Sequence, residues 1–312
     1  MKVDLEEHMA QRRRKRIGGK IVVTVAVFIL AGTAIFTGYR MLGKKSPKSD
    51  KKNTSSSDKK REIPAINTNV SVRDRIAEKE ARKKQNNRED FAVQPGDVPG
   101  VQEQTQEKVV YLTLDDGPSP NTQAVLDILD KYQVKATFFV TNGMPEYSYM
   151  IKEAYDRGHT IGLHTYSHDY AVVYASQDAY FKDLEAIGEV VKGQIGYVPC
   201  FIRFPGGSSN TVSRKYTSGI MTALAQEVQN RGYQYYDWNA SSGDGGVLST
   251  EELVNNATSF NENNIILLSH DSAAKQTTVE ALPRIIEHYQ SLGYEFRALD
   301  RDTYVPHHGI NN

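Results

Sequence analysis

Two adjacent carboxylates, Asp115 and Asp116, stand at the end of the apolar stretch VVYLTL and directly before Gly117. Neighbouring side chains on a strand point to opposite faces, so both carboxylates cannot enter a core while the strand continues. Where the strand ends, the chain can turn and direct both into one cleft. His164 and His168 stand four residues apart in HTYSH, a spacing that suits two imidazole ligands of one metal ion, although such a pair alone is a weak signal.

A carboxylate from another strand end would complete a site of two histidines and one carboxylate, with positions left open for water. One of the two aspartates can be that ligand. The other is then free to act as a base on metal-bound water, whose pKa the metal lowers. His270, in LLSHD, suits general acid catalysis because imidazole titrates near neutral pH.

Apolar runs alternate with segments of helical spacing between residues 109 and 305. The runs predict seven strands: Val109–Leu114, Ala136–Val140, Thr160–His164, Cys200–Phe204, Tyr233–Trp238, Asn264–His270 and Tyr294–Leu299. The segments predict six helices: Thr122–Tyr132, Tyr147–Arg157, Ser176–Gly193, Thr217–Arg231, Thr250–Glu262 and Thr278–Leu292. Strict alternation predicts parallel strands with helices outside, for which a closed barrel is the natural solution.

In such barrels the chemistry sits at the C-terminal ends of the strands. Polar residues stand at five of these ends: Asp115 and Asp116, the His164–His168 stretch, the Arg203–Gly207 stretch, Asp237 with Trp238, and His270 with Asp271. Solubility is a poor explanation for five such ends together. The pattern therefore predicts one active-site rim.

Five short motifs, in the order TLDDG, HTYSH, R-x-P, DW and LLSHD, resemble those of the polysaccharide deacetylases, the carbohydrate esterase family of the NodB-homology type. The resemblance covers Val109–Leu299 and nothing before it. It implies a distorted (β/α) barrel and the removal of acetyl groups from N- or O-acetylated sugars. It also implies one divalent metal ion, with Zn as the leading candidate and Co, Ni or Mn as alternatives.

The resemblance assigns a role to each matching position. Asp115 is similar to the catalytic base and His270 to the acid. Asp116, His164 and His168 are similar to the metal ligands of the family.

Further roles follow from the same resemblance. Arg203 matches the arginine that orients the base, and Asp237 matches the acid that tunes the catalytic histidine. Trp238 and Leu268 match the walls of the acetyl pocket. Gly206 stands where the family usually has tyrosine, so it keeps the backbone N–H that binds the oxyanion and loses the ring.

Four tyrosines near the rim, namely Tyr166, Tyr170, Tyr235 and Tyr236, could stack on sugar rings, although amphipathic packing is the commoner role. The single cysteine, Cys200, lies in an apolar segment and is expected to be a small buried hydrophobe.

The N-terminus has the pattern of a membrane anchor. Residues 1–20 are basic, with five consecutive charges from Arg12 to Arg16, and the uncharged run 21–39 is long enough to span a bilayer. The basic cluster favours a cytoplasmic N-terminus and an extracellular catalytic domain, and hence localisation in the cell membrane. A cleaved signal peptide is the alternative, with small residues at Ala31–Ala34.

Residues 40–108 are rich in Lys, Ser and Asp and predict an extracellular low-complexity stalk, followed by a catalytic domain at 109–305 and a frayed tail at 306–312 that holds His307 and His308. Residues 1–108 carry 24 basic and 14 acidic side chains, whereas residues 109–312 carry 14 basic and 24 acidic ones. An acidic domain argues against a nucleic-acid partner, because binding to phosphates needs clustered Lys and Arg.

An anchored, outward-facing deacetylase would act on the glycan around the membrane. N-acetylglucosamine of peptidoglycan is the leading substrate, with N-acetylmuramic acid second and poly-N-acetylglucosamine, chitin or acetylxylan as further options. A catalytically inactive glycan-binding module and a stalked adhesion protein are the non-enzymatic alternatives.

Overall fold

The computed structural model describes residues 89–312. The predicted basic segment at 1–20, the anchor at 21–39 and residues 40–88 of the predicted stalk lie outside the described residues. Between residues 89 and 312, no helix is long and apolar enough to cross a membrane.

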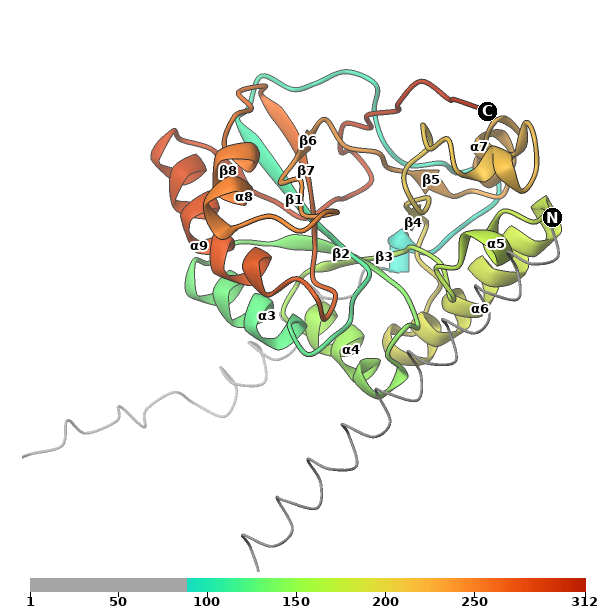
Figure 1. Ribbon diagram of the computed structural model, residues 1–312, viewed down its shortest axis with the longest axis horizontal. Helices are drawn as coiled ribbons and strands as arrows, with labels where there is room; N and C mark the ends of the chain where they lie inside the picture. Colours follow the sequence, from blue (N-terminus) through green and yellow to red (C-terminus); the bar gives the residue numbers. More distant parts are fainter. Residues whose placement is uncertain (1–88) are drawn as a thin grey trace, which may run out of the picture. The chain divides into compact units, whose positions relative to one another are not determined.

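A parallel sheet forms the centre of the domain, in the order β5-β4-β3-β2-β1-β7-β6, with β8 paired to β1 (Figure 1). The strands are β1 Val109–Asp115, β2 Ala136–Val140, β3 Thr160–Leu163, β4 Phe201–Ile202, β5 Gln234–Tyr235, β6 Ala240–Ser241, β7 Asn264–His270 and β8 Glu295–Phe296. The predicted distorted (β/α) barrel is confirmed. The closed barrel expected from strict alternation is wrong: in the described part of the chain the strand order ends at β5 and β6, so backbone pairing does not close the sheet.

Helices surround the sheet (Figure 1): α3 Thr122–Lys131, α4 Tyr149–Asp156, α5 Tyr170–Val173, α6 Gln177–Ile195, α7 Ile220–Asn230, α8 Thr250–Ala257 and α9 Gln276–Ser291. Their ends follow local chemistry. Ser249 and Glu252 form a capping box at the start of α8. Gly196 adopts a φ of 93° where α6 ends, a conformation that a residue with a Cβ rarely takes.

Every residue of β1 and β2 is buried. Strands covered on both faces need continuous apolar runs rather than alternation, which explains why these two were readable from the sequence. One side packs against the helices, and the other forms a smaller cluster that includes Phe139, Phe201 and Cys200. Burial raises the pKa of the Cys200 thiol to about 12, in agreement with a hydrophobic role.

The predicted boundary between stalk and domain at residue 108 is too late. Phe91 packs edge-on against Phe201 with 5.1 Å between ring centroids, and Ala92 forms an antiparallel bridge with Pro199. A second bridge joins Val101 to Tyr304. Residues 89–108 therefore belong to the folded domain, although their isolated apolar residues lack any periodicity.

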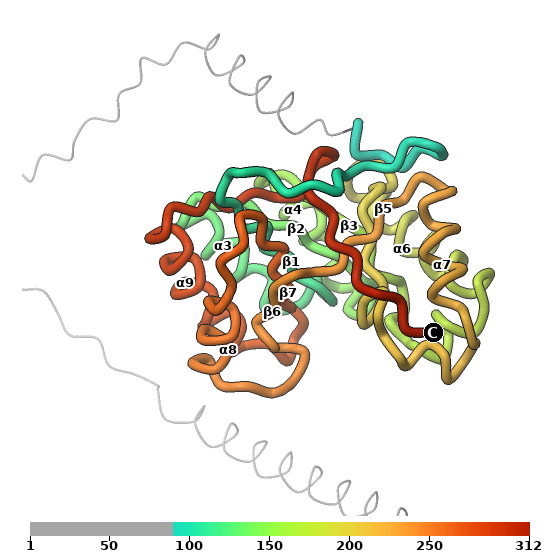
Figure 2. The backbone as a smooth tube through the Cα atoms, turned by 90° about the horizontal axis from the view of Figure 1, so that it is seen from above, coloured from blue at the N-terminus to red at the C-terminus, as the bar shows by residue number. Residues whose placement is uncertain are grey.

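The C-terminal residues are bonded to the domain, so the prediction of a frayed tail at His307 and His308 is wrong. His307 stacks on Tyr235 at 3.9 Å between centroids, and the backbone N–H of His308 donates to Asp237 at 2.8 Å. The chain then runs toward α7 (Figure 2), where Asn312 bonds Thr222. Hydrogen bonds, ring stacking and the packing of Ile310 against the hydrophobic core hold this segment.

Candidate active site

Asp115 is the last residue of β1, and only 3% of its surface is exposed. Arg203 Nη1 donates a 2.8 Å hydrogen bond to Asp115 Oδ1, and the guanidinium is fully buried. Arg203 also donates to Thr113 Oγ1 and to the backbone oxygens of Tyr236 and Asp237. A guanidinium fixed by four hydrogen bonds holds the carboxylate in one orientation.

Asp116, His164 and His168 offer three ligand atoms that lie within 4.8 Å of one another. Asp116 Oδ1 is 3.5 Å from His164 Nε2 and 3.3 Å from His168 Nε2. That oxygen is buried and accepts no hydrogen bond from any described residue. A buried, unpaired carboxylate oxygen beside two imidazole nitrogens fits a divalent cation, because the cation would satisfy all three atoms.

The backbone supports this cluster with two unusual conformations. Asp116 has a φ of 71° and His168 a φ of 52°, both in the left-handed region that residues with a Cβ rarely adopt. Such strain is concentrated at functional sites, where the surrounding structure has to hold it. Asp183 of α6 does so for the loop before His168, since its Oδ1 accepts from the N–H of Tyr166 at 2.6 Å.

The second ring nitrogen of His164 fixes the tautomer that a metal ligand would need. His164 Nδ1 lies 2.7 Å from the carbonyl oxygen of Arg203, so the Nδ1–H donates there and Nε2 keeps its lone pair. Burial, and after it the neighbouring His168, lower the pKa of His164 to about 3. The imidazole is therefore neutral at physiological pH, as a ligand must be.

His270 ends β7, and its register partner on β1 is Asp115. His270 Nδ1 lies 2.8 Å from Asp244 Oδ1, and its backbone N–H donates to Asp244 Oδ2. Burial alone would lower the pKa of His270, but the hydrogen bond to Asp244, together with the charges of Asp115, Asp244 and Asp116, raises it to about 9. The protonated ring can present its Nε2–H to the site.

The prediction that Asp237 tunes His270 is wrong. Both carboxylate oxygens of Asp237 have other partners: Oδ1 accepts from the N–H of Ser208 at 2.8 Å, and Oδ2 accepts from Ser208 Oγ and the N–H of His308. Asp237 follows β5, whereas Asp244 follows β6. Strand β6 pairs with β7, and β7 carries His270. The sheet order therefore places Asp244, and not Asp237, where it can bond His270.

Sequence reasoning missed Asp244 because the preceding strand, β6, has only two residues and no apolar run by which it could be predicted. The available signal was the stretch SSGDGG, which places one acid in a glycine-rich turn. Asp271 was also given no role. It is fully buried, accepts from Thr122 Oγ1 at 2.5 Å, and its N–H donates to the backbone oxygen of Asp115, so it fixes the turn after β1.

The three predicted substrate contacts lie on the same rim, and their roles remain predictions. Gly206 is exposed, with a φ of 75°, and its N–H has no partner in residues 89–312. Trp238 is half-buried and lies over Arg203, with 5.7 Å between the guanidinium carbon and the ring centroid. Leu268 is a buried residue of β7.

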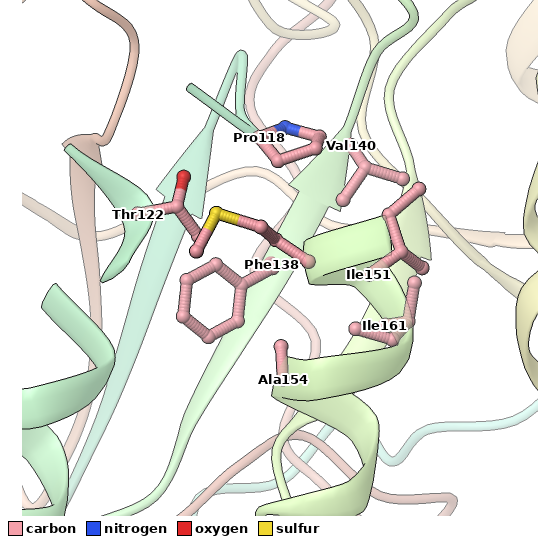
Figure 3. Close-up of a pocket in the computed structure, with 8 residues that line it drawn as sticks. Pro118, Thr122, Phe138, Val140, Ile151, Ala154 and Ile161 are labelled. Carbon is pink, nitrogen blue, oxygen red and sulfur yellow. The ribbon is translucent and has the colours of Figure 1, made fainter. Parts of the chain in front are cut away.

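An apolar pocket lies behind the rim rather than in it. Phe138 and Val140 of β2 line it from the sheet, and Ile151 and Ala154 of α4 from the helix layer (Figure 3). Pro118 closes it on the side of the turn after Asp116. The pocket holds none of the predicted catalytic or metal-binding residues and is a gap in helix–sheet packing.

Comparison with known proteins agrees with this geometry. Residues 102–222 match the family model described as polysaccharide deacetylase. A Bacillus subtilis protein that bears the name of a polysaccharide deacetylase, YheN, is 31% identical over 82% of this chain and 86% of its own length. A peptidoglycan-N-acetylglucosamine deacetylase of Bacillus cereus is 28% identical over 64% of this chain and 72% of its own.

Among solved structures, the catalytic domain of a peptidoglycan N-acetylglucosamine deacetylase from Eubacterium rectale is similar with a TM-score of 0.65. The two are 47% identical, and the match covers 68% of this chain and 97% of that one. With the barrel, the acid–histidine cluster and these relatives in agreement, the chain belongs to the polysaccharide deacetylase family of hydrolases.

Proposed function

We propose that the protein removes acetyl groups from N-acetylglucosamine residues of cell-wall peptidoglycan and releases acetate. The proposal takes its substrate from the relatives in Bacillus cereus and Eubacterium rectale, whose names specify that glycan. Its chemistry rests on one observation: the Arg203-bound Asp115 and the Asp244-bound His270 are register partners on adjoining strands, next to the Asp116–His164–His168 cluster.

Asp116, His164 and His168 would hold one divalent ion, with Zn as the leading choice and Co, Ni or Mn as alternatives that suit the same donors. When bound, such an ion supplies Lewis-acid chemistry that lowers the pKa of water and polarises a carbonyl group. Asp115 lies outside this set. Arg203 holds its Oδ1, and its Oδ2, 3.9 Å from His164 Nε2, is left to accept a proton.

The residues of the chain then divide the remaining steps. Asp115 takes a proton from the attacking water while the oxygen of that water forms a bond to the acetyl carbon. The N–H of Gly206 donates to the oxygen that gains charge. His270 gives its Nε2 proton to the nitrogen as the C–N bond breaks, and Asp244 keeps the ring oriented and protonated for that transfer.

A panel of glycans tests the substrate. Full-length protein in detergent, loaded with Zn, is incubated with peptidoglycan, N-acetylglucosamine oligomers, chitin and acetylxylan, and acetate is measured. We expect acetate from peptidoglycan with new free amines on its glucosamine residues. Amines on muramic acid alone, or acetate from acetylxylan alone, would move the activity to another substrate. Glycan binding without acetate from any substrate would favour an inactive binding module.

We also propose that residues 21–39 anchor the protein in the cell membrane with the domain outside, as the basic residues before an uncharged run favour. Protease added to intact cells with a permeable wall should remove the domain and leave a membrane-held N-terminal fragment. Protection of the full-length chain, or a mature protein that lacks residues 1–39, would contradict this topology.

A further inference from the structure

Tyr170 lies between His168 and the loop that follows β4. It is the first residue of α5, and its ring packs edge-on against His168 at 5.9 Å between centroids and against Tyr174 at 5.5 Å. Tyr174 is fixed, because its hydroxyl donates to the backbone oxygen of Pro205 at 2.8 Å. Residues four apart share a face of a helix, so both rings meet the loop at Pro205 and Gly206.

The hydroxyl of Tyr170 occupies the place of a side chain at residue 206. A Cβ added to Gly206 would lie 2.5 Å from Tyr170 Oη and 3.5 Å from its Cζ. Gly206 also has a φ of 75°, which disfavours a Cβ independently. Gly206 stands where the family motif has a tyrosine. In this chain the hydroxyl of Tyr170, from α5, lies at that place instead.

Two hydrogen-bond donors are unused at this point of the rim. Tyr170 is half-buried, and none of the described residues accepts a hydrogen bond from its hydroxyl. The same holds for the N–H of Gly206. By contrast, the hydroxyl of Tyr174 donates to Pro205, and Arg203 makes four hydrogen bonds. Two free donors side by side, next to a cluster that fits a metal ion, point to a ligand oxygen that accepts from both.

We propose that Tyr170 is a catalytic residue whose hydroxyl donates to the acetyl carbonyl oxygen beside the N–H of Gly206. The inference rests on the proposed deacetylation and adds to it a second donor to the oxyanion. That donor comes from α5, an element outside the five motifs that the sequence displays.

Tyr170→Phe removes the hydroxyl and keeps the ring packing against His168. We expect kcat to fall about 10²-fold in full-length, Zn-loaded protein, the lower end of the loss for one preorganised donor. KM and bound metal should change little, since the donor acts on charge that develops in the transition state. Tyr132→Phe, which removes an exposed hydroxyl bonded to Glu287, is the matched control and should leave kcat unchanged.

A comparison of amide and ester substrates separates hydrogen-bond donation by Tyr170 from a role in supporting the metal ligand His168. Both develop charge on the carbonyl oxygen, so Tyr170→Phe should slow an N-acetylglucosamine oligomer and an aryl acetate by similar factors. A kcat within twofold of wild type on both would overturn the inference, as would metal loss in parallel with activity, which would make Tyr170 a support for His168. A wild-type protein that cleaves the aryl acetate and no glycan would contradict the proposed substrate alone. One that cleaves neither would overturn both proposals.

A double-mutant cycle tests the placement of the hydroxyl without any activity. Gly206→Ala brings a Cβ against Tyr170 Oη in wild type, whereas in Tyr170→Phe the nearest ring atom is 3.5 Å away. The backbone strain at residue 206 is common to both backgrounds and cancels in the cycle. Gly206→Ala should therefore lower Tm less in the Tyr170→Phe background. An equal decrease in both would contradict the contact on which the inference rests.

Discussion

Asp237 and Asp244 are buried carboxylates on one rim, yet they hold different partners. Asp244 bonds both the ring and the backbone of His270, whereas Asp237 ties Ser208 to His308. Asp244 is therefore the one that can control His270, the proposed general acid. The DW motif alone therefore could not identify the acid that bonds His270. The short strand β6, which separates Asp237 from Asp244, could not be predicted from the sequence.

The pH profile distinguishes the two aspartates. As the proposed general acid, His270 must be protonated to donate, so kcat should fall as pH rises through its pKa of about 9. Asp244→Asn removes the hydrogen-bonded charge that raises this pKa, so the alkaline limb of the kcat profile should move to lower pH by about 1–2 pH units. Asp237→Asn should leave that limb in place. A shift of the alkaline limb in Asp237→Asn and none in Asp244→Asn would show that Asp237, and not Asp244, controls the pKa of His270.

Metal content distinguishes Asp115 from Asp116. Asp116→Asn and His164→Ala each remove one of the three proposed ligands and should weaken metal binding about 10-fold or more, as even an outer partner of a ligand typically contributes that much. Asp115→Asn should keep its metal and lose activity, because Asp115 lies outside the three-residue cluster and Arg203 holds its Oδ1. Metal analysis after dialysis measures this, and equal loss in all three variants would show that the two roles are not separate.

At the scale of elements, the C-terminal segment supports the rim. His308 donates to the buried carboxylate of Asp237, which holds the N–H of Ser208, and His307 covers Tyr235. The backbone oxygen of Asp237 also accepts from Arg203. The segment therefore supports both the loop of Gly206 and the guanidinium that orients Asp115.

Deleting residues 307–312 should lower the free energy of unfolding of the domain by about 2–4 kcal/mol. Loss of a donor to a buried carboxylate contributes about 1.5–3 kcal/mol of this, and loss of the ring stacking about 0.5–1.5 kcal/mol. Denaturant unfolding of full-length protein measures it. Deletion of Asn311 and Asn312 alone, which are exposed, is the control and should change little. Equal stability of both deletions would mean that the segment only rests on the surface.

The length of a helix or strand decides whether the sequence predicts it. Continuous apolar runs predict β1 and β7, which carry Asp115 and His270 to one rim, and helical periodicity predicts the amphipathic α9. The elements β6 and α5, of two and four residues, are too short for any period and are set by tertiary contacts. Asp244, which follows β6, was consequently missed, and Tyr170 of α5 was given only a general role.

At the scale of the whole molecule, the chain combines a predicted membrane anchor with a domain of the polysaccharide deacetylase family. An anchor would confine the activity to glycan within reach of the membrane. In the proposed reaction, acetate release requires both the metal ligands and a separate base.

Acetate release during metal titration tests this claim most directly. Full-length protein is stripped with chelator, supplied with increasing Zn and assayed on peptidoglycan, with Asp115→Asn treated in parallel. We predict that wild-type activity rises to a plateau at one ion per chain, while Asp115→Asn binds the same single ion and releases acetate at least about 10²-fold more slowly. Full activity in stripped protein, or a metal-loaded Asp115→Asn variant as active as wild type, would contradict the account.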